Sequence, residues 1–152
     1  MRVRIFDHYT SSMATIKKSV ERKETLLQYS ANAWNPNNSK TATKTYYLSA
    51  ESPYTLDVVN MLLRHQVKVE RATKAFTVSD AVDYHNGQAG SKNMPAGTYI
   101  VSTSQSRNLF ITSILERRLA IEDSVMYDMA TWSAILAYNL EGYASNTKHS
   151  VT

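Results

Sequence analysis

Residues 94–105, MPAGTYIVSTSQ, carry the pattern from which the fold is predicted. Pro95 restricts φ and Gly97 tolerates a positive φ, so the stretch opens with a tight turn. Residues 98–102 are mostly β-branched or aromatic, which predicts a buried strand, and a polar segment then leads into a helix. A second patterned stretch, YDMATWS at residues 127–133, opens an aromatic-rich helix. Neither stretch holds a nucleophile paired with a base or a metal-ligand cluster, so both are interpreted as structural.

Upstream of this stretch the sequence alternates between strand and helix patterns. Residues 45–49 are rich in β-prone side chains, and Ser52-Pro53 provides a helix start. The helix that follows ends near His65, and residues 67–71 alternate with period two, as in a half-buried strand. Strand, helix and strand in this order predict a right-handed βαβ unit. We therefore expect an α/β fold, with a small, mostly parallel βαβ-based sheet and flanking helices.

The remaining elements are assigned by the same patterns. Residues 76–78 begin an extended segment, Asn86-Gly87 marks a turn, and the polar tract that runs to Asn93 is predicted to be a loop. One helix is expected from about Ser106 to Arg118, and the last helix from about Met129 to Tyr143.

The N-terminal region predicts a long amphipathic helix over residues 10–30. Its apolar residues follow one another at spacings of three, four and seven, and are Met13, Ile16, Val20 and Leu27. The opposite face is charged, so this stripe is expected to pack on something outside the helix. Residues 32–44 are a turn-rich linker that contains Trp34, and they mark the expected domain boundary.

Composition limits the classes of function. The 152 residues fit one domain, or one domain with an appendage. Although 17 Lys and Arg against 13 Asp and Glu give a net charge of +4, no arginine–aromatic motif of a nucleic-acid module occurs, so no nucleic-acid partner is expected. The chain has no cysteine, which excludes a disulfide framework and a cysteine nucleophile within it. No apolar run approaches the roughly 20 residues of a membrane span, and the N-terminus has no signal-peptide pattern.

The histidines do not form a metal-binding pattern. The four are His8, His65, His85 and His149, and none begins a His-x-x-Glu or His-Glu-x-x-His motif. We therefore expect none of them to bind a metal.

The densest polar cluster is Asp80, Asp83, His85 and Asn86. Its functional interpretation is a cation or sugar site. The alternative, which we favour, is a solvated hairpin with turn-forming side chains. Calcium in particular would require more oxygen ligands at closer spacing.

Two further candidates also have structural alternatives. Ser104-Gln105-Ser106 lies between a strand and a helix, where α/β folds often bind ligands, but no sequence motif supplies a base, so a helix cap is favoured. The aromatic residues near the last helix would suit a carbohydrate platform, yet their helical spacing favours packing. They are Tyr127, Trp132, Tyr138 and Tyr143.

Residues 11–145 resemble the C-terminal region of bacterial zinc carboxypeptidase-like proteins of the carboxypeptidase A type. The closest matches are residues 95–101 and 127–133, and weaker ones are residues 24–27, 46–48, 58–63 and 67–73. The signature residues of this resemblance are Pro95, Gly97, Tyr99, Tyr127, Asp128 and Trp132.

The resemblance implies a small α/β domain, similar in outline to the class I glutamine amidotransferase fold, that follows a catalytic domain and a long helix. The zinc of that family is held by a His-x-x-Glu pair and a distant His, and no position here matches them. The resemblance therefore places zinc in the catalytic domain, implies no cofactor in this chain, and suggests a periplasmic or extracellular location. The implied domains are a connecting helix (1–31), a linker (32–44), an α/β accessory domain (45–145) and a disordered tail (146–152).

The leading hypothesis is thus a non-catalytic accessory domain whose partner is a peptidase domain. Self-association through the N-terminal helix is the other way in which its apolar stripe would be covered. The alternative function is a peptide- or glycan-binding module that uses Trp34, Tyr84 and the loop from Asp80 to Asn86. A third hypothesis is an enzyme whose residues converge only in three dimensions.

Overall fold

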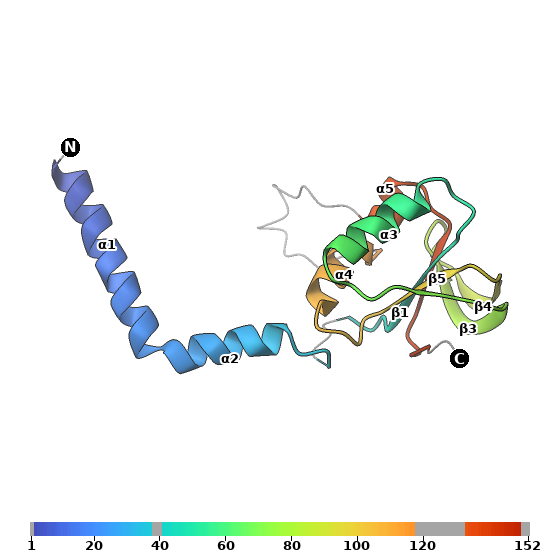
Figure 1. Cartoon of the computed structure of the whole chain (residues 1–152), viewed down its shortest axis with the longest axis horizontal. Coiled ribbons are helices and arrows are strands. Elements are labelled where there is room, and N and C mark those ends of the chain that lie inside the picture. Colours follow the sequence, from blue (N-terminus) through green and yellow to red (C-terminus); the bar gives the residue numbers. More distant parts are fainter. Residues whose placement is uncertain (1, 38–40, 118–132, 150–152) are drawn as a thin grey trace. The chain divides into compact units, whose positions relative to one another are not determined.

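The computed structural model describes residues 2–37, 41–117 and 133–149, and the chain separates into two units, Met1–Asn35 and Pro36–Thr152. The first contains two helices, α1 (Arg2–Glu21) and α2 (Lys23–Ala33), which meet at an angle in Figure 1. The single helix predicted over residues 10–30 is therefore longer at both ends and is interrupted. The interruption lies at Arg22, whose φ and ψ of −110° and 19° leave the α-helical region.

The second unit is built on one sheet. Within the described residues the sheet has six strands in the order β2-β5-β1-β6-β3-β4, and every pair is antiparallel. The strands are β1 (Thr45–Leu48), β2 (Glu70–Arg71), β3 (Phe76–Asp83), β4 (Ala89–Met94), β5 (Tyr99–Ser102) and β6 (Gly142–Ser145).

The predicted parallel βαβ sheet is wrong. Strand β1, helix α3 (Thr55–Arg64) and strand β2 do follow in the expected order, but β5 lies between the two strands and pairs antiparallel with both. Strands β1 and β2 consequently run in the same direction without touching, as in a split β–α–β arrangement. Strand β5 occupies the gap because its residues are apolar enough to be buried on both faces of the sheet, Ile100 at 1% and Val101 at 0% exposure.

The two faces of the sheet have separate apolar clusters. Tyr46 and Val101 cluster with residues of α3, α4 (Asn108–Leu115) and α5 (Ala134–Ala137) on one face. Figure 1 shows these three helices beside the sheet. The alternate residues Tyr47, Ile100 and Tyr143 point to the opposite face, where they cluster with Val78 and Met94. Strand β1 is buried along its whole length because it contributes to both clusters.

The C-terminal part of the chain differs from the predicted helix over residues 129–143, of which 129–132 lie outside the described residues. Helix α5 covers only Ala134–Ala137, and Asn139, with a positive φ of 49°, ends it. Residues 142–145 then form β6, a central strand between β1 and β3. Gly142 fits this close connection because it leaves room for Ile135 of α5.

The hairpin of β3 and β4 contains the predicted Asn86-Gly87 turn, in which Gly87 has a φ of 73° and its N–H donates to the Asp83 carbonyl at 2.9 Å. The tract predicted to be a loop up to Asn93 is instead mostly strand β4. This strand lies at the edge of the sheet and its residues 89–93 are all exposed, so an apolar pattern is not required.

Candidate functional site

The first unit carries a continuous row of exposed apolar side chains on α1. Phe6, Tyr9, Met13, Ile16 and Val20 follow one another at spacings of three and four, and their exposed fractions are 67, 66, 48, 58 and 67%. We call these five residues the apolar stripe. Alternating spacings of three and four place them on one side of a helix, in the pattern of a helix–helix seam. The stripe extends over about 21 Å of helix axis.

The structure extends the stripe that the sequence indicated. Met13, Ile16 and Val20 are exposed, as the accessory-domain hypothesis expects, and Leu27 on α2 is 68% exposed. Phe6 and Tyr9 were missed because the predicted helix began at Thr10. The signal was present in the sequence, since the same spacing continues backward from Met13.

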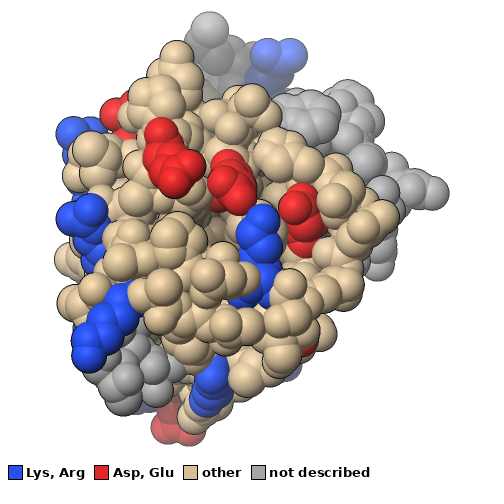
Figure 2. Space-filling model, turned by 90° about the vertical axis from the view of Figure 1, so that its right-hand side faces the viewer, with Lys and Arg blue, Asp and Glu red and all other residues tan. Residues whose placement is uncertain are grey.

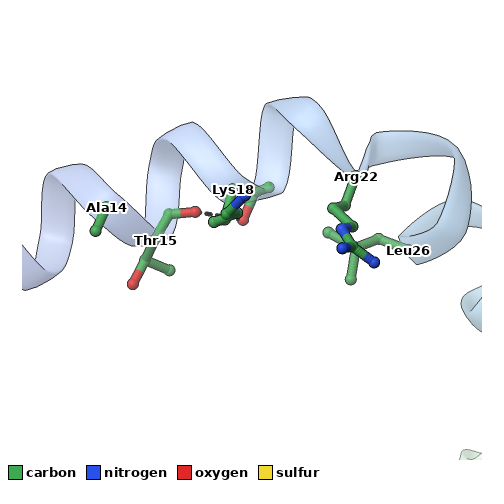
Figure 3. A pocket seen from close by; sticks show the side chains of 6 residues that line it. Ala14, Thr15, Lys18, Arg22 and Leu26 are labelled. Carbon is green, nitrogen blue, oxygen red and sulfur yellow. Dashed lines mark hydrogen bonds between the residues drawn. The ribbon is translucent and has the colours of Figure 1, made fainter.

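A hollow of about 560 Å³ lies where α1 and α2 meet. Figure 3 shows Thr15, Lys18 and Arg22 on the same side of the two helices, with Leu26 beside them. These α1 residues lie on the side of the helix opposite the apolar stripe, given 100° of rotation per residue. Lys18 is paired with Glu21 at 2.7 Å. The hollow at the bend is therefore separate from the stripe.

The signature residues that the structure describes lie in one turn and one strand. The turn at Pro95 and Gly97 is confirmed: Gly97 has a φ of 94°, and the Thr98 N–H donates to the Pro95 carbonyl at 3.3 Å. Tyr99 begins β5, with the Arg71 guanidinium 5.6 Å from its ring centre. These residues shape the sheet rather than converging on a cavity. Tyr127, Asp128 and Trp132 lie outside the described residues.

The polar cluster of residues 80–86 is hydrogen-bonded within the fold, as its structural alternative expects. Asp83 Oδ1 accepts from the N–H groups of His85 and Asn86 at 2.8 and 3.3 Å. The His85 Nε2 lies 3.1 Å from the Leu140 carbonyl oxygen. Tyr84 is 1% exposed and its hydroxyl donates to the Leu115 carbonyl oxygen. A ligand surface on this loop therefore cannot include the Tyr84 ring.

Asp80 fixes the segment that follows β6. Its carboxylate accepts from the Ser145 hydroxyl at 2.7 Å, the Asn146 N–H at 3.0 Å and the Thr147 hydroxyl at 3.1 Å. These hydrogen bonds lower the pKa of Asp80 below its ordinary value of 3.8, and the hydrogen bond from Ser145 has the largest effect. Residues 146–149, assigned from the sequence to a disordered tail, are thus held against the sheet.

Asp80→Asn should remove stability at neutral pH, and the deficit should shrink in acid. A lowered folded-state pKa contributes stability above the unfolded-state pKa, and this is lost as pH falls through the folded-state value. The melting temperatures of wild type and Asp80→Asn, followed from about pH 7 to about pH 2, should therefore converge. Glu51→Gln is the control for loss of an exposed carboxylate. A difference in melting temperature between wild type and Asp80→Asn that stays constant over this pH range would contradict the stabilising role of the Asp80 carboxylate.

The histidines are dispersed. His8 lies on α1, His65 stacks near Phe110 with ring centres 4.3 Å apart, and His149 stacks on Phe76 at 4.5 Å. Within residues 2–37, 41–117 and 133–149, no group of three or more His, Cys, Asp or Glu side chains could hold a metal ion.

A mixed cluster of charges lies on the sheet face opposite the helices. The Tyr143 hydroxyl donates to Glu141 Oε1 at 2.6 Å, and Lys92 Nζ lies 3.6 Å from the same oxygen and 4.9 Å from the Tyr143 ring centre. Burial is the main cause that raises the pKa of Tyr143, and the hydrogen bond to Glu141 raises this pKa further. Figure 2, which views the side where β3 and β4 lie, shows acidic and basic side chains interspersed rather than a patch of one sign.

Beneath the helices, two buried tyrosines tie α4 to the sheet. The Tyr46 hydroxyl donates to Glu116 Oε2 at 2.8 Å, and Arg117 Nε donates to the Tyr84 carbonyl at 2.8 Å. Burial raises the pKa of both Tyr46 and Tyr84, so both hydroxyls remain protonated donors. This arrangement stabilises the fold.

Across the part of the chain that the structure describes, no helix has the length and apolar character needed to cross a membrane. Comparison of the chain with protein-family models, with curated proteins and with solved structures yields no match.

Proposed function

We propose that this chain is a non-catalytic accessory domain that packs on a zinc carboxypeptidase A-type peptidase domain through the apolar stripe of α1. The observation that carries the proposal is the exposure of the stripe, at 48–67% for each of its five side chains. The sequence resemblance supplies the class of partner. The zinc of the reaction would belong to the partner domain, and this chain would contribute packing.

The stripe needs a partner on energetic grounds. Helices of this length in water owe most of their stability to packing of an apolar face, and α2 has only 11 residues. A contiguous row of exposed apolar side chains on a folded protein usually marks an interaction site. Further exposed apolar residues on the two helices are Val3, Ile5, Leu26, Leu27 and Tyr29.

The residues beside the stripe favour a protein partner over a lipid surface. Ser12 and Ser19 flank it on one side, and Thr10 and Lys17 on the other. A helix that lies on an anionic membrane typically borders its apolar face with several Lys or Arg residues. Three of these four residues are Ser or Thr and Lys17 alone is charged, so the flanks allow another helix to approach, as in knobs-into-holes packing.

Ile16→Glu should weaken binding to a bacterial carboxypeptidase A-type catalytic domain by about 100-fold or more. Burying an uncompensated charge in an apolar interface costs several kcal/mol, and each 1.4 kcal/mol is tenfold in Kd. Thr15→Glu adds the same charge one position away, on the opposite side of the helix, and should leave Kd unchanged. Calorimetric titration of the two variants and the wild type gives the comparison.

Four results would contradict the proposal. One is equal weakening by both substitutions, and another is tight binding of the stripe to anionic vesicles in place of the peptidase domain. The third is peptide hydrolysis by the chain alone with added zinc, abolished by a chelator. A dimer by light scattering that Ile16→Glu dissociates would assign the stripe to a second copy instead.

A further inference from the structure

A hollow of about 380 Å³ lies on the sheet face opposite α3–α5, at the edge formed by β2 and β5. Its floor is Ile100, which pairs with Tyr47 of β1. The side chains of both residues lie on the sheet face opposite α3–α5. Ser102 lies two residues further along β5 and shares that face, and Glu70 pairs directly with Ile100 across β2. The volume falls in the range of small-molecule sites.

Both walls of the hollow are held by hydrogen bonds. On one side, Gln105 binds the main chain of Lys68: Oε1 accepts from its N–H at 2.8 Å and Nε2 donates to its carbonyl at 3.2 Å. On the other side, the His149 N–H donates to Thr45 Oγ1 at 3.2 Å, and its ring stacks on Phe76. The segments that carry Lys68 and Lys148 are therefore fixed to the sheet before any ligand binds.

The charges that line the hollow are unbalanced. Two lysines, Lys68 and Lys148, and one acidic residue, Glu70, are among the residues that line it. The described part of the chain contains two salt bridges, Lys18–Glu21 and Lys92–Glu141, and neither involves these groups. Ser102 Oγ accepts from the Ser104 N–H at 3.1 Å, which leaves its O–H free to donate toward the hollow.

We propose that this hollow binds a small ligand through an oxyanion group, a carboxylate or a phosphate, placed between Lys68 and Lys148. Two ammonium groups and the serine hydroxyls supply donors, and lysine binds such groups as a point charge without a fixed geometry. The apolar floor at Ile100 would contact the uncharged part of the ligand. The negative charge of Glu70 repels the anion and so lowers the affinity of the hollow for it. This site is independent of the apolar stripe and of the proposed peptidase partner.

The test is a titration of the full chain with inorganic phosphate and, separately, with acetate, at constant ionic strength and followed by ¹H–¹⁵N spectra. Saturable shifts are expected at the amides of Lys68, Ser102, Ser104 and His149. Lys68→Gln and Lys148→Gln should each weaken binding about fivefold, and Glu70→Gln should strengthen it, because a nearby surface charge contributes on the order of 1 kcal/mol. Lys74→Gln removes the same charge outside the hollow and should change the affinity less than about twofold.

The phosphate and acetate arms decide which oxyanion is preferred, and saturation by either supports the site. Linear, non-saturating shifts with both anions would overturn the proposal. Equal weakening by Lys74→Gln would also overturn it, since the response would then reflect net charge alone. Unchanged spectra outside the hollow confirm that each variant is folded.

Discussion

Leu62→Ala is expected to lower the free energy of unfolding of the Pro36–Thr152 unit by about 2–5 kcal/mol. Leu62 is 0% exposed and lies on the face of α3 that packs against the sheet, within the cluster that contains Tyr46, Val101 and Leu115. Truncation removes apolar contacts and leaves a cavity that the surrounding helices and strands only partly fill. Urea denaturation followed by circular dichroism gives the change, with the slope m checked for constancy.

The neighbouring residue provides a matched control. Leu63 is 50% exposed on the same helix, so Leu63→Ala changes the same number of atoms and should cost less than about 1 kcal/mol. A similar cost for the two substitutions would mean that α3 does not present this face to the sheet.

Gly142→Ala is the second large effect, with an expected loss of about 1–3 kcal/mol. A Cβ at this position would lie 2.5 Å from Ile135 Cγ2 and 3.3 Å from Ile135 Cδ1. Contacts this short force α5 away from β6 or Ile135 out of its rotamer, and Ile135 is 0% exposed in the close-packed core. Thermal denaturation measures the loss.

Two comparisons make this prediction specific. Gly90→Ala places a methyl group where nothing lies within 4 Å and should be nearly neutral. In the background of Ile135→Ala, which removes the clashing Cγ2, Gly142→Ala should cost markedly less, and the difference is the coupling energy of the pair. Additive losses would show that the two residues do not touch.

Local sequence signals predicted the turns and several elements, and failed where distant segments pair. The turn at Pro95 and Gly97, strand β5 and helix α4 depend on nearby residues, so they could be predicted. The parallel sheet was wrong because the order of β1, α3 and β2 does not reveal that β5, almost 30 residues further along, lies between the two strands. Such pairings depend on packing of the whole sheet.

Strand β6 was missed for a related reason. Residues 142–145 follow an aromatic segment whose spacing continues a helical pattern, and a four-residue strand buried on both faces shows no alternation. The clearest local sign was Gly142, a residue that favours a close backbone approach over a helix interior.

The two candidate surfaces differ in how far the sequence could predict them. The apolar stripe lies on one helix, so its spacing is visible in the sequence, and only its first two residues were missed. The hollow beside β2 and β5 combines residues 68–70, 100–105 and 148–149, which the order of β2, β5, β1 and β6 in the sheet brings together. No single segment carries its pattern.

Amide hydrogen exchange of the full chain, alone as a verified monomer and with a carboxypeptidase A-type catalytic domain, tests whether α1 binds the peptidase domain. In the monomer, exchange is expected to be rapid throughout α1 and α2 and slow in β1, β5 and β6, because only the sheet has a packed core. Adding the partner should slow exchange along α1 while leaving the sheet unchanged. Strong protection of α1 in the monomer, with no change on adding the partner, would show that α1 does not bind the peptidase domain.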